Sequence, residues 1–158
     1  MKTIKEQKEV ISITDCVKTY EDACKILEVE PRNFDGMEKD EIAYLKMKTI
    51  VKALNEGWYP KFTKDEYRWF PWYYLYTQKE IDRMSQEDKE SVVLWGGAAD
   101  SGAYCGLASA RSYDGWSSAD AFFGSRLALK NRELARYFGT QFIGIIADFV
   151  CFQEENNK

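Results

Sequence analysis

The stretch from Val92 to Leu129 constrains the fold of this 158-residue chain more than any other part. It opens with a short apolar segment that runs into two glycines, and it closes on the sequence FGSRL. Between them, residues 98–122 are rich in Ser, Ala, Gly, Asp and Tyr. A long polar stretch in a compact domain is typically a functional loop or a disordered segment. Because aromatic residues are interleaved here, we interpret it as an ordered loop surface.

The composition is that of one ordinary globular domain. Hydrophobic residues make up 45% of the chain and charged residues 30%, and this length can bury a real core. The net charge of -4 gives no general attraction to phosphate backbones, so nucleic acid is not an expected partner. The N-terminal residues contain no apolar run long enough for a signal peptide or a membrane span. We therefore expect a protein that stays in the cytoplasm of the producing cell.

The absence of histidine excludes several classes of site at once. Ser-His-Asp and Cys-His catalysis, His-metal sites and histidine pH switches are all ruled out. The four cysteines form no C-x-x-C pair, so we expect reduced, mostly buried thiols and neither a metal nor a cofactor. An enzyme would have to act through carboxylates, Lys, Tyr, Cys or a bound cofactor.

Helical signals flank the aromatic centre of the chain. Residues 1–15 suggest a flexible arm or an edge strand at residues 9–13, and Thr19 with Asp22 forms an N-cap pair for a short helix that ends before Pro31. Apolar residues at helical spacing predict a core-facing helix over residues 39–55, ended by Gly57 as the C′ residue.

The segment from Tyr67 to Tyr76, YRWFPWYYLY, is strongly β-prone because bulky rings suit a pleated surface. Pro71 lacks a backbone donor and belongs at an edge, a bulge or a strand start. Two interpretations stay open. The segment is either a strand buried on one side or an aromatic platform for a ligand. A short helix over residues 79–84 and a strand over residues 91–95 follow.

The C-terminal part of the chain predicts one long helix. Asn131 is its expected N-cap, and the helix runs to about residue 152. An apolar stripe steps by three or four residues through Leu134, Phe138, Phe142, Ile145, Phe149 and Phe152. Gly139 and Gly144 lower helix propensity there, which indicates close packing against another element.

Three phrases of the central stretch carry a resemblance to a known family. They are Leu94-Trp95-Gly96-Gly97, Ala108-Ser109-Ala110-Arg111 and Gly124-Ser125-Arg126-Leu127. Their order resembles the end of a C-type-lectin-like domain, in the branch shared by formylglycine-generating enzymes and the variable proteins of diversity-generating retroelements. The chain departs from that pattern at Gly124-Ser125-Arg126, where an aromatic residue often stands, and in its additional C-terminal helix.

A second resemblance covers ALNEGWYPKF, RWFPWYYLY and GSRLALKNRELARYFGTQF, which are similar to uncharacterised proteins of gut bacteria and their phages. It implies a mobile-element origin and an association with virions. The first resemblance would imply catalysis through a cysteine pair and a metal, but only Cys105 lies in the corresponding region.

The sequence therefore predicts a single α+β domain (residues 1–158) with a mixed or antiparallel sheet and two or three packed helices. Residues 16–90 form a helical and aromatic-strand half, residues 91–129 a lectin-like glycine-rich loop region, and residues 130–152 the C-terminal helix. For Arg126 we expect a buried or half-buried structural guanidinium, with anion binding as the alternative.

Three functions follow from these features. The first is a non-enzymatic module that binds a protein or a glycan. Its expected contacts are Asp100, Tyr104, Arg111, Tyr113, Asp114, Trp116 and Asp120. The second is a phage structural or assembly protein that oligomerises through the apolar stripe of its last helix. The third is a hydrolase in which Asp114 and Asp120 act as paired carboxylates.

Overall fold

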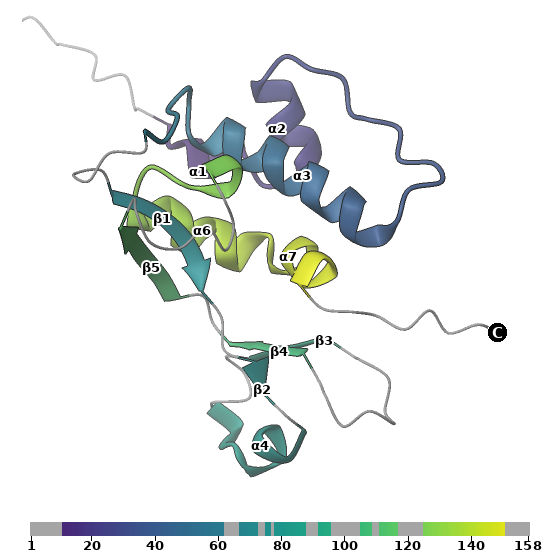
Figure 1. The fold of residues 1–158 in the computed structure, drawn as a ribbon, viewed down its shortest axis with the longest axis vertical. Helices are drawn as coiled ribbons and strands as arrows, with labels where there is room; N and C mark the ends of the chain where they lie inside the picture. The colour runs from purple at the N-terminus through teal and green to yellow at the C-terminus, as the bar shows by residue number, and fades with distance from the viewer. Residues whose placement is uncertain are drawn as a thin grey trace, which may run out of the picture.

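The computed structural model describes residues 11–61, 67–72, 75–76, 78–87, 92–95, 105–108, 111–116 and 125–150. It combines helices and short strands, which confirms an α+β chain (Figure 1). The described elements are α1 (Ile13–Cys16), α2 (Tyr20–Ile26), α3 (Lys39–Leu54), β1 (Tyr67–Trp72), β2 (Leu75–Tyr76), α4 (Gln78–Arg83), β3 (Val92–Trp95), β4 (Cys105–Ala108), β5 (Arg111–Trp116), η1 (Ser125–Leu127), α6 (Arg132–Gln141) and α7 (Ile143–Val150).

The hydrophobic core lies where α3 packs against α2 and α7 (Figure 1). Helix α3 is confirmed at nearly the expected bounds, and its apolar stripe is the face that the fold buries. The fully buried side chains of the core include Val17, Cys24, Met47, Ile50, Leu54, Leu127, Leu129 and Ile146. Burying large aliphatic side chains stabilises a fold by about 1.5–3 kcal/mol each relative to exposure, so this helical layer supplies much of the folding free energy.

The start of α2 is the capping box predicted from the sequence. The Thr19 hydroxyl accepts a hydrogen bond from the Asp22 backbone N–H, and the Asp22 carboxylate accepts one from the Thr19 N–H. The expected strand over residues 9–13 is not found in its described part. Instead α1 begins at Ile13, because the Ser12 side chain accepts from the Thr14 N–H and caps a helical turn.

The end of α3 differs by one residue from the prediction. Asn55 is the C-cap, and the left-handed turn that follows occupies two residues, Glu56 with a φ of 48° and Gly57 with a φ of 84°. Glycine adopts such a conformation without the steric cost that a β-carbon brings. Gly57 therefore completes the turn that Glu56 begins, instead of forming it alone.

The aromatic segment forms two strands in separate sheets instead of one continuous strand. Strand β1 pairs antiparallel with β5, and β2 joins β4 and β3 in the order β2-β4-β3. Backbone groups of successive residues point to opposite edges of a strand, so those of residues two apart point to the same edge. Trp69 exchanges two hydrogen bonds with Leu129, so Pro71, two residues on, directs its missing donor to the same edge, away from β5. The expectation of an edge position for Pro71 is thus confirmed.

Two helices replace the single C-terminal helix predicted from the sequence. Asn131 caps α6 as expected, but Phe142 leaves the helical conformation, with φ -109° and ψ 23°, and α7 begins at Ile143. Phe138 and Phe142 are both buried in the core of the chain itself. These two rings are therefore not exposed for assembly, and of the described stripe residues only Phe149 is exposed.

Candidate functional site

The structure divides the site residues predicted from the sequence. Asp100, Tyr104 and Asp120 lie outside the described residues. The other four belong to β5, in the register Arg111↔Trp72, Tyr113↔Phe70, Asp114↔Trp69 and Trp116↔Tyr67. Because successive residues of a strand face opposite sides, these four positions fall into two pairs on opposite faces of the β1–β5 sheet.

Helix α6 packs on the sheet formed by β1 and β5. Trp69 is half-buried against the core, and the guanidinium of Arg132 from α6 lies 5.1 Å from the centroid of its ring. The positions of Asp114 and Trp116 share that face, whereas those of Arg111 and Tyr113 share the opposite one. The four positions therefore lie two on each face of this sheet.

The described part of β1 resembles a buried strand more than an open aromatic platform. Arg68 and Pro71 are buried, and Trp69 and Phe70 are half-buried. Among the described side chains of β1, only that of Tyr67 is exposed. These rings therefore contribute mainly to packing, as expected for aromatic residues between a sheet and a helix.

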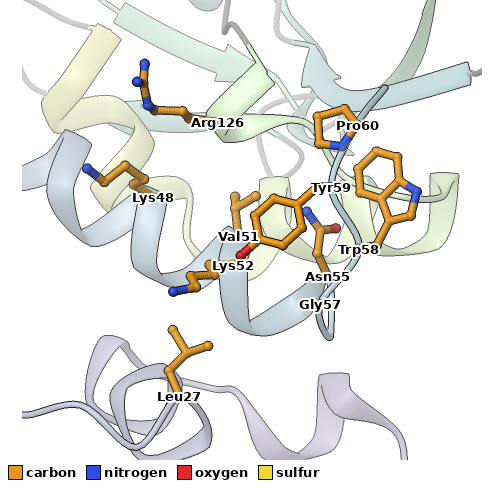
Figure 2. Close-up of a pocket in the computed structure, with 10 residues that line it drawn as sticks. All are labelled: Leu27, Lys48, Val51, Lys52, Asn55, Gly57, Trp58, Tyr59, Pro60 and Arg126. Carbon is orange, nitrogen blue, oxygen red and sulfur yellow. The ribbon is translucent and has the colours of Figure 1, made fainter. Parts of the chain in front are cut away.

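A pocket with different lining residues lies at the C-terminal end of α3 (Figure 2). Its volume is about 450 Å³, which falls in the range of small-molecule sites. The lining residues come from α2, α3, the turn after α3, and η1. They are Leu27, Lys48, Val51, Lys52, Asn55, Gly57, Trp58, Tyr59, Pro60 and Arg126.

Asn55 connects the two segments that form the pocket. Its side-chain amide donates to the Ala128 carbonyl at 2.8 Å and accepts from the Lys130 N–H at 3.1 Å. Lys130 in turn pairs with the Glu56 carboxylate. Leu127 and Leu129 are buried next to these contacts, which anchors the backbone after Arg126. The end of α3 and the segment carrying Arg126 are thereby fixed against each other.

Three cationic side chains line this pocket. Lys48 and Lys52 lie one turn apart on α3, and Arg126 comes from η1 (Figure 2). Within the described part of the chain, Lys52 and Arg126 have no ion pair, while the Lys48 ammonium lies 5.7 Å from the centroid of the Tyr44 ring. The described lining includes no carboxylate. The pocket therefore has a local positive charge that the net charge of the chain does not reveal.

Arg126 corrects one expectation from the sequence. Its side chain is exposed, not buried or half-buried, because the adjacent Leu127 occupies the core and η1 turns Arg126 outward. The prediction that the Arg126 guanidinium is a buried or half-buried structural group is therefore wrong. Anion binding, the alternative, is compatible with its position beside two lysines.

Aromatic residues line the pocket together with these cations. Trp58 is half-buried, and its backbone N–H donates to the Asn55 carbonyl at 2.9 Å. Tyr59 is 67% exposed, and Figure 2 shows its ring lying between Trp58 and the Lys52 side chain in this view. An exposed ring of this size offers a stacking surface, since every planar ligand presents a π-face.

Sequence reasoning missed most of this pocket. The spacing of Lys48 and Lys52 places them on one helix face, and the following Trp-Tyr pair is visible in the sequence. Those signals are indistinguishable from a solvated helix face and a turn. The pocket is defined by the position of Arg126, which lies near these residues in the fold although it is far from them in the sequence.

Other classes of site receive no support from the described residues. No group of three or more Cys, Asp or Glu side chains is arranged there to hold a metal ion. Cys16 is exposed and Cys24 buried, both as free thiols, so only one of these two follows the burial expected of cysteine. None of the helices in the described ranges is long and apolar enough to cross a membrane.

Comparisons with known proteins leave the family open. No protein-family model, curated protein or solved structure matches this chain.

Proposed function

We propose that this chain is a non-enzymatic binding domain that takes an anionic ligand in the pocket at the end of α3. The observation that carries the proposal is that Lys48, Lys52 and Arg126 all line one pocket whose described lining contains no carboxylate. Arginine binds phosphate and carboxylate groups through a planar fork, and lysine adds a mobile point charge. Such a set favours a compact anion.

Binding is favoured over catalysis by the chemistry of the same lining. The described lining residues include no Asp, Glu or Cys, and the chain has no histidine. These are the side chains that most often act as general acids, bases or nucleophiles, and of the remaining groups with such chemistry the described lining has Lys48, Lys52 and Tyr59. The pocket offers cationic side chains, aromatic rings and the Asn55 amide, which is already hydrogen-bonded to backbone groups. Such a lining is suited to holding a ligand.

Titration with inorganic phosphate, followed by backbone amide NMR, tests this proposal. We expect shifts at residues 48–59 and at Arg126 that weaken as salt rises, because exposed charges are screened. The double variant Lys52→Ala/Arg126→Ala should lose at least about tenfold in affinity. The matched control Lys25→Ala removes a highly exposed lysine of α2 outside the pocket lining and should change nothing. Unchanged binding in the double variant would refute an anion site here.

A second candidate is recognition of a protein or glycan through the predicted 98–122 surface with a lectin-like arrangement. Strand β5 lies within that stretch and carries four of the expected contacts, two on each face of the β1–β5 sheet. A single binding face predicts unequal effects of Tyr113→Ala and Trp116→Ala, which occupy opposite faces. Glycan-array binding by both variants measures this. Equal losses of glycan binding in the two variants would exclude a site confined to a single face of the sheet. A mobile-element origin and virion association remain part of this proposal.

A further inference from the structure

The pocket at the end of α3 combines two kinds of recognition surface. Lys48, Lys52 and Arg126 supply positive charge, whereas Trp58, Tyr59 and Pro60 supply planar and apolar area (Figure 2). Val51, a buried core residue of α3, also lines the pocket. A simple anion would use only the first group and would leave the exposed Tyr59 ring in contact with water. A ligand that uses both groups has an anionic end and a planar end.

We propose, building on the proposed function, that the ligand is a small molecule carrying a phosphate group and an aromatic ring, of the mononucleotide class. A phosphate monoester carries close to two negative charges at neutral pH and offers three acceptor oxygens. Two lysines and an arginine can match that charge, and a base can stack on an exposed phenol ring. The pocket volume of about 450 Å³ fits a ligand of this class.

The polar groups of the pocket predict weak discrimination among bases. Reading a base requires donors and acceptors directed at its edge. The only amide side chain in the described lining belongs to Asn55, which is buried and bonded to Ala128 and Lys130. The remaining uncharged polar side-chain groups of the described lining are the hydroxyl of exposed Tyr59 and the indole N–H of half-buried Trp58. Recognition therefore depends on phosphate charge and ring stacking, and bases should be nearly interchangeable.

Calorimetry of the full chain with inorganic phosphate, adenosine and adenosine 5′-monophosphate separates the two contributions. We expect the nucleotide to bind about tenfold or more tightly than phosphate, because stacking adds to the ionic contacts. Adenosine alone should bind more weakly than the nucleotide. Guanosine and cytidine 5′-monophosphates should fall within about fivefold of the adenosine nucleotide, since stacking tolerates every base.

Tyr59 gives the decisive variants because its exposed side chain is not part of the core. Tyr59→Ala should reduce nucleotide affinity to the level of inorganic phosphate and leave phosphate binding unchanged. Tyr59→Phe keeps the ring and should retain the nucleotide affinity, which controls for folding. Arg126→Ala should weaken phosphate and nucleotide together.

The outcomes distinguish this inference from the proposed function. If phosphate binds at the pocket and the nucleotide binds no more tightly, the aromatic side has no role and the ligand class is wrong, while the anion site stands. If Tyr59→Ala leaves nucleotide affinity unchanged, the ligand class is also wrong. If neither phosphate nor nucleotide shifts the pocket residues, both the site and its ligand are refuted.

Discussion

The side-chain amide of Asn55 donates a 2.8 Å hydrogen bond to the backbone carbonyl of Ala128, 73 residues further along the chain. The same amide accepts from the Lys130 N–H. One buried side chain therefore satisfies two backbone groups of a segment that has only one residue, Leu129, bridged to β1. This contact positions Arg126 beside α3 and so defines the candidate pocket.

Asn55→Ala should lower the free energy of unfolding by about 2–4 kcal/mol, because it leaves a buried carbonyl and a backbone N–H without their partner. Urea denaturation measures the loss. Asn55→Asp keeps the acceptor for Lys130 but cannot donate to Ala128, so it should also destabilise. The surface control Lys25→Ala should stay within about 0.5 kcal/mol of the parent chain. A neutral Asn55→Ala would show that the segment is held by Leu127 and Leu129 alone.

Arg126→Ala and Arg68→Ala should differ sharply in stability. Arg126 is exposed, so its removal should change the free energy of unfolding by no more than about 0.5 kcal/mol. Arg68 is 7% exposed inside β1, and truncating it should cost about 2 kcal/mol or more. Chemical denaturation of both variants makes the comparison. Equal losses in the free energy of unfolding would support the structural role that the sequence predicts for Arg126.

Phe138→Ala should destabilise the chain by about 3–5 kcal/mol, because the ring is buried and its removal leaves a cavity. Phe149 is 36% exposed and stacks on Tyr44 with ring centroids 5.9 Å apart. Its truncation should cost less than about 2 kcal/mol. Thermal unfolding measures the loss of stability in the two variants, and sedimentation velocity measures their oligomeric state. A monomeric Phe149→Ala variant derived from an oligomeric parent would instead assign that ring to assembly.

The stability contributed by Asp22 should be lost in acid. Hydrogen bonding with the Thr19 side chain, then with the Lys18 backbone, together with the nearby charge of Lys25 and the Thr19 backbone N–H, lowers the pKa of Asp22 in the folded chain. Its ordinary pKa is about 3.9. A lowered folded pKa gives stability that is complete above the unfolded pKa and disappears as the pH falls through the folded value.

Asp22→Asn tests this linkage. The parent chain should be more stable than the variant near neutral pH, and the difference should shrink as the pH falls below the ordinary pKa of an aspartate toward the lowered pKa of folded Asp22. Urea unfolding across that pH range measures the difference. An unchanged difference at low pH would contradict a lowered pKa.

Features that depend on neighbours in the sequence could be predicted without the structure. The caps at Thr19 and Asn131 and the buried face of α3 follow from hydrogen-bonding side chains and helical spacing within a few residues. The edge position of Pro71 follows from its missing donor. In each case the physical cause is local, so the sequence determines it alone.

Tertiary structure decided everything that joins distant residues. It divided the aromatic segment between two sheets, ended α6 at Gln141, and turned Arg126 outward beside Lys48 and Lys52. Strand pairing and helix packing depend on burial summed over the whole chain, which no local pattern contains. The sequence alone determined the caps at Thr19 and Asn131 and the buried face of α3, whereas the pocket exists only because the fold brings residues 48–60 and 126 together.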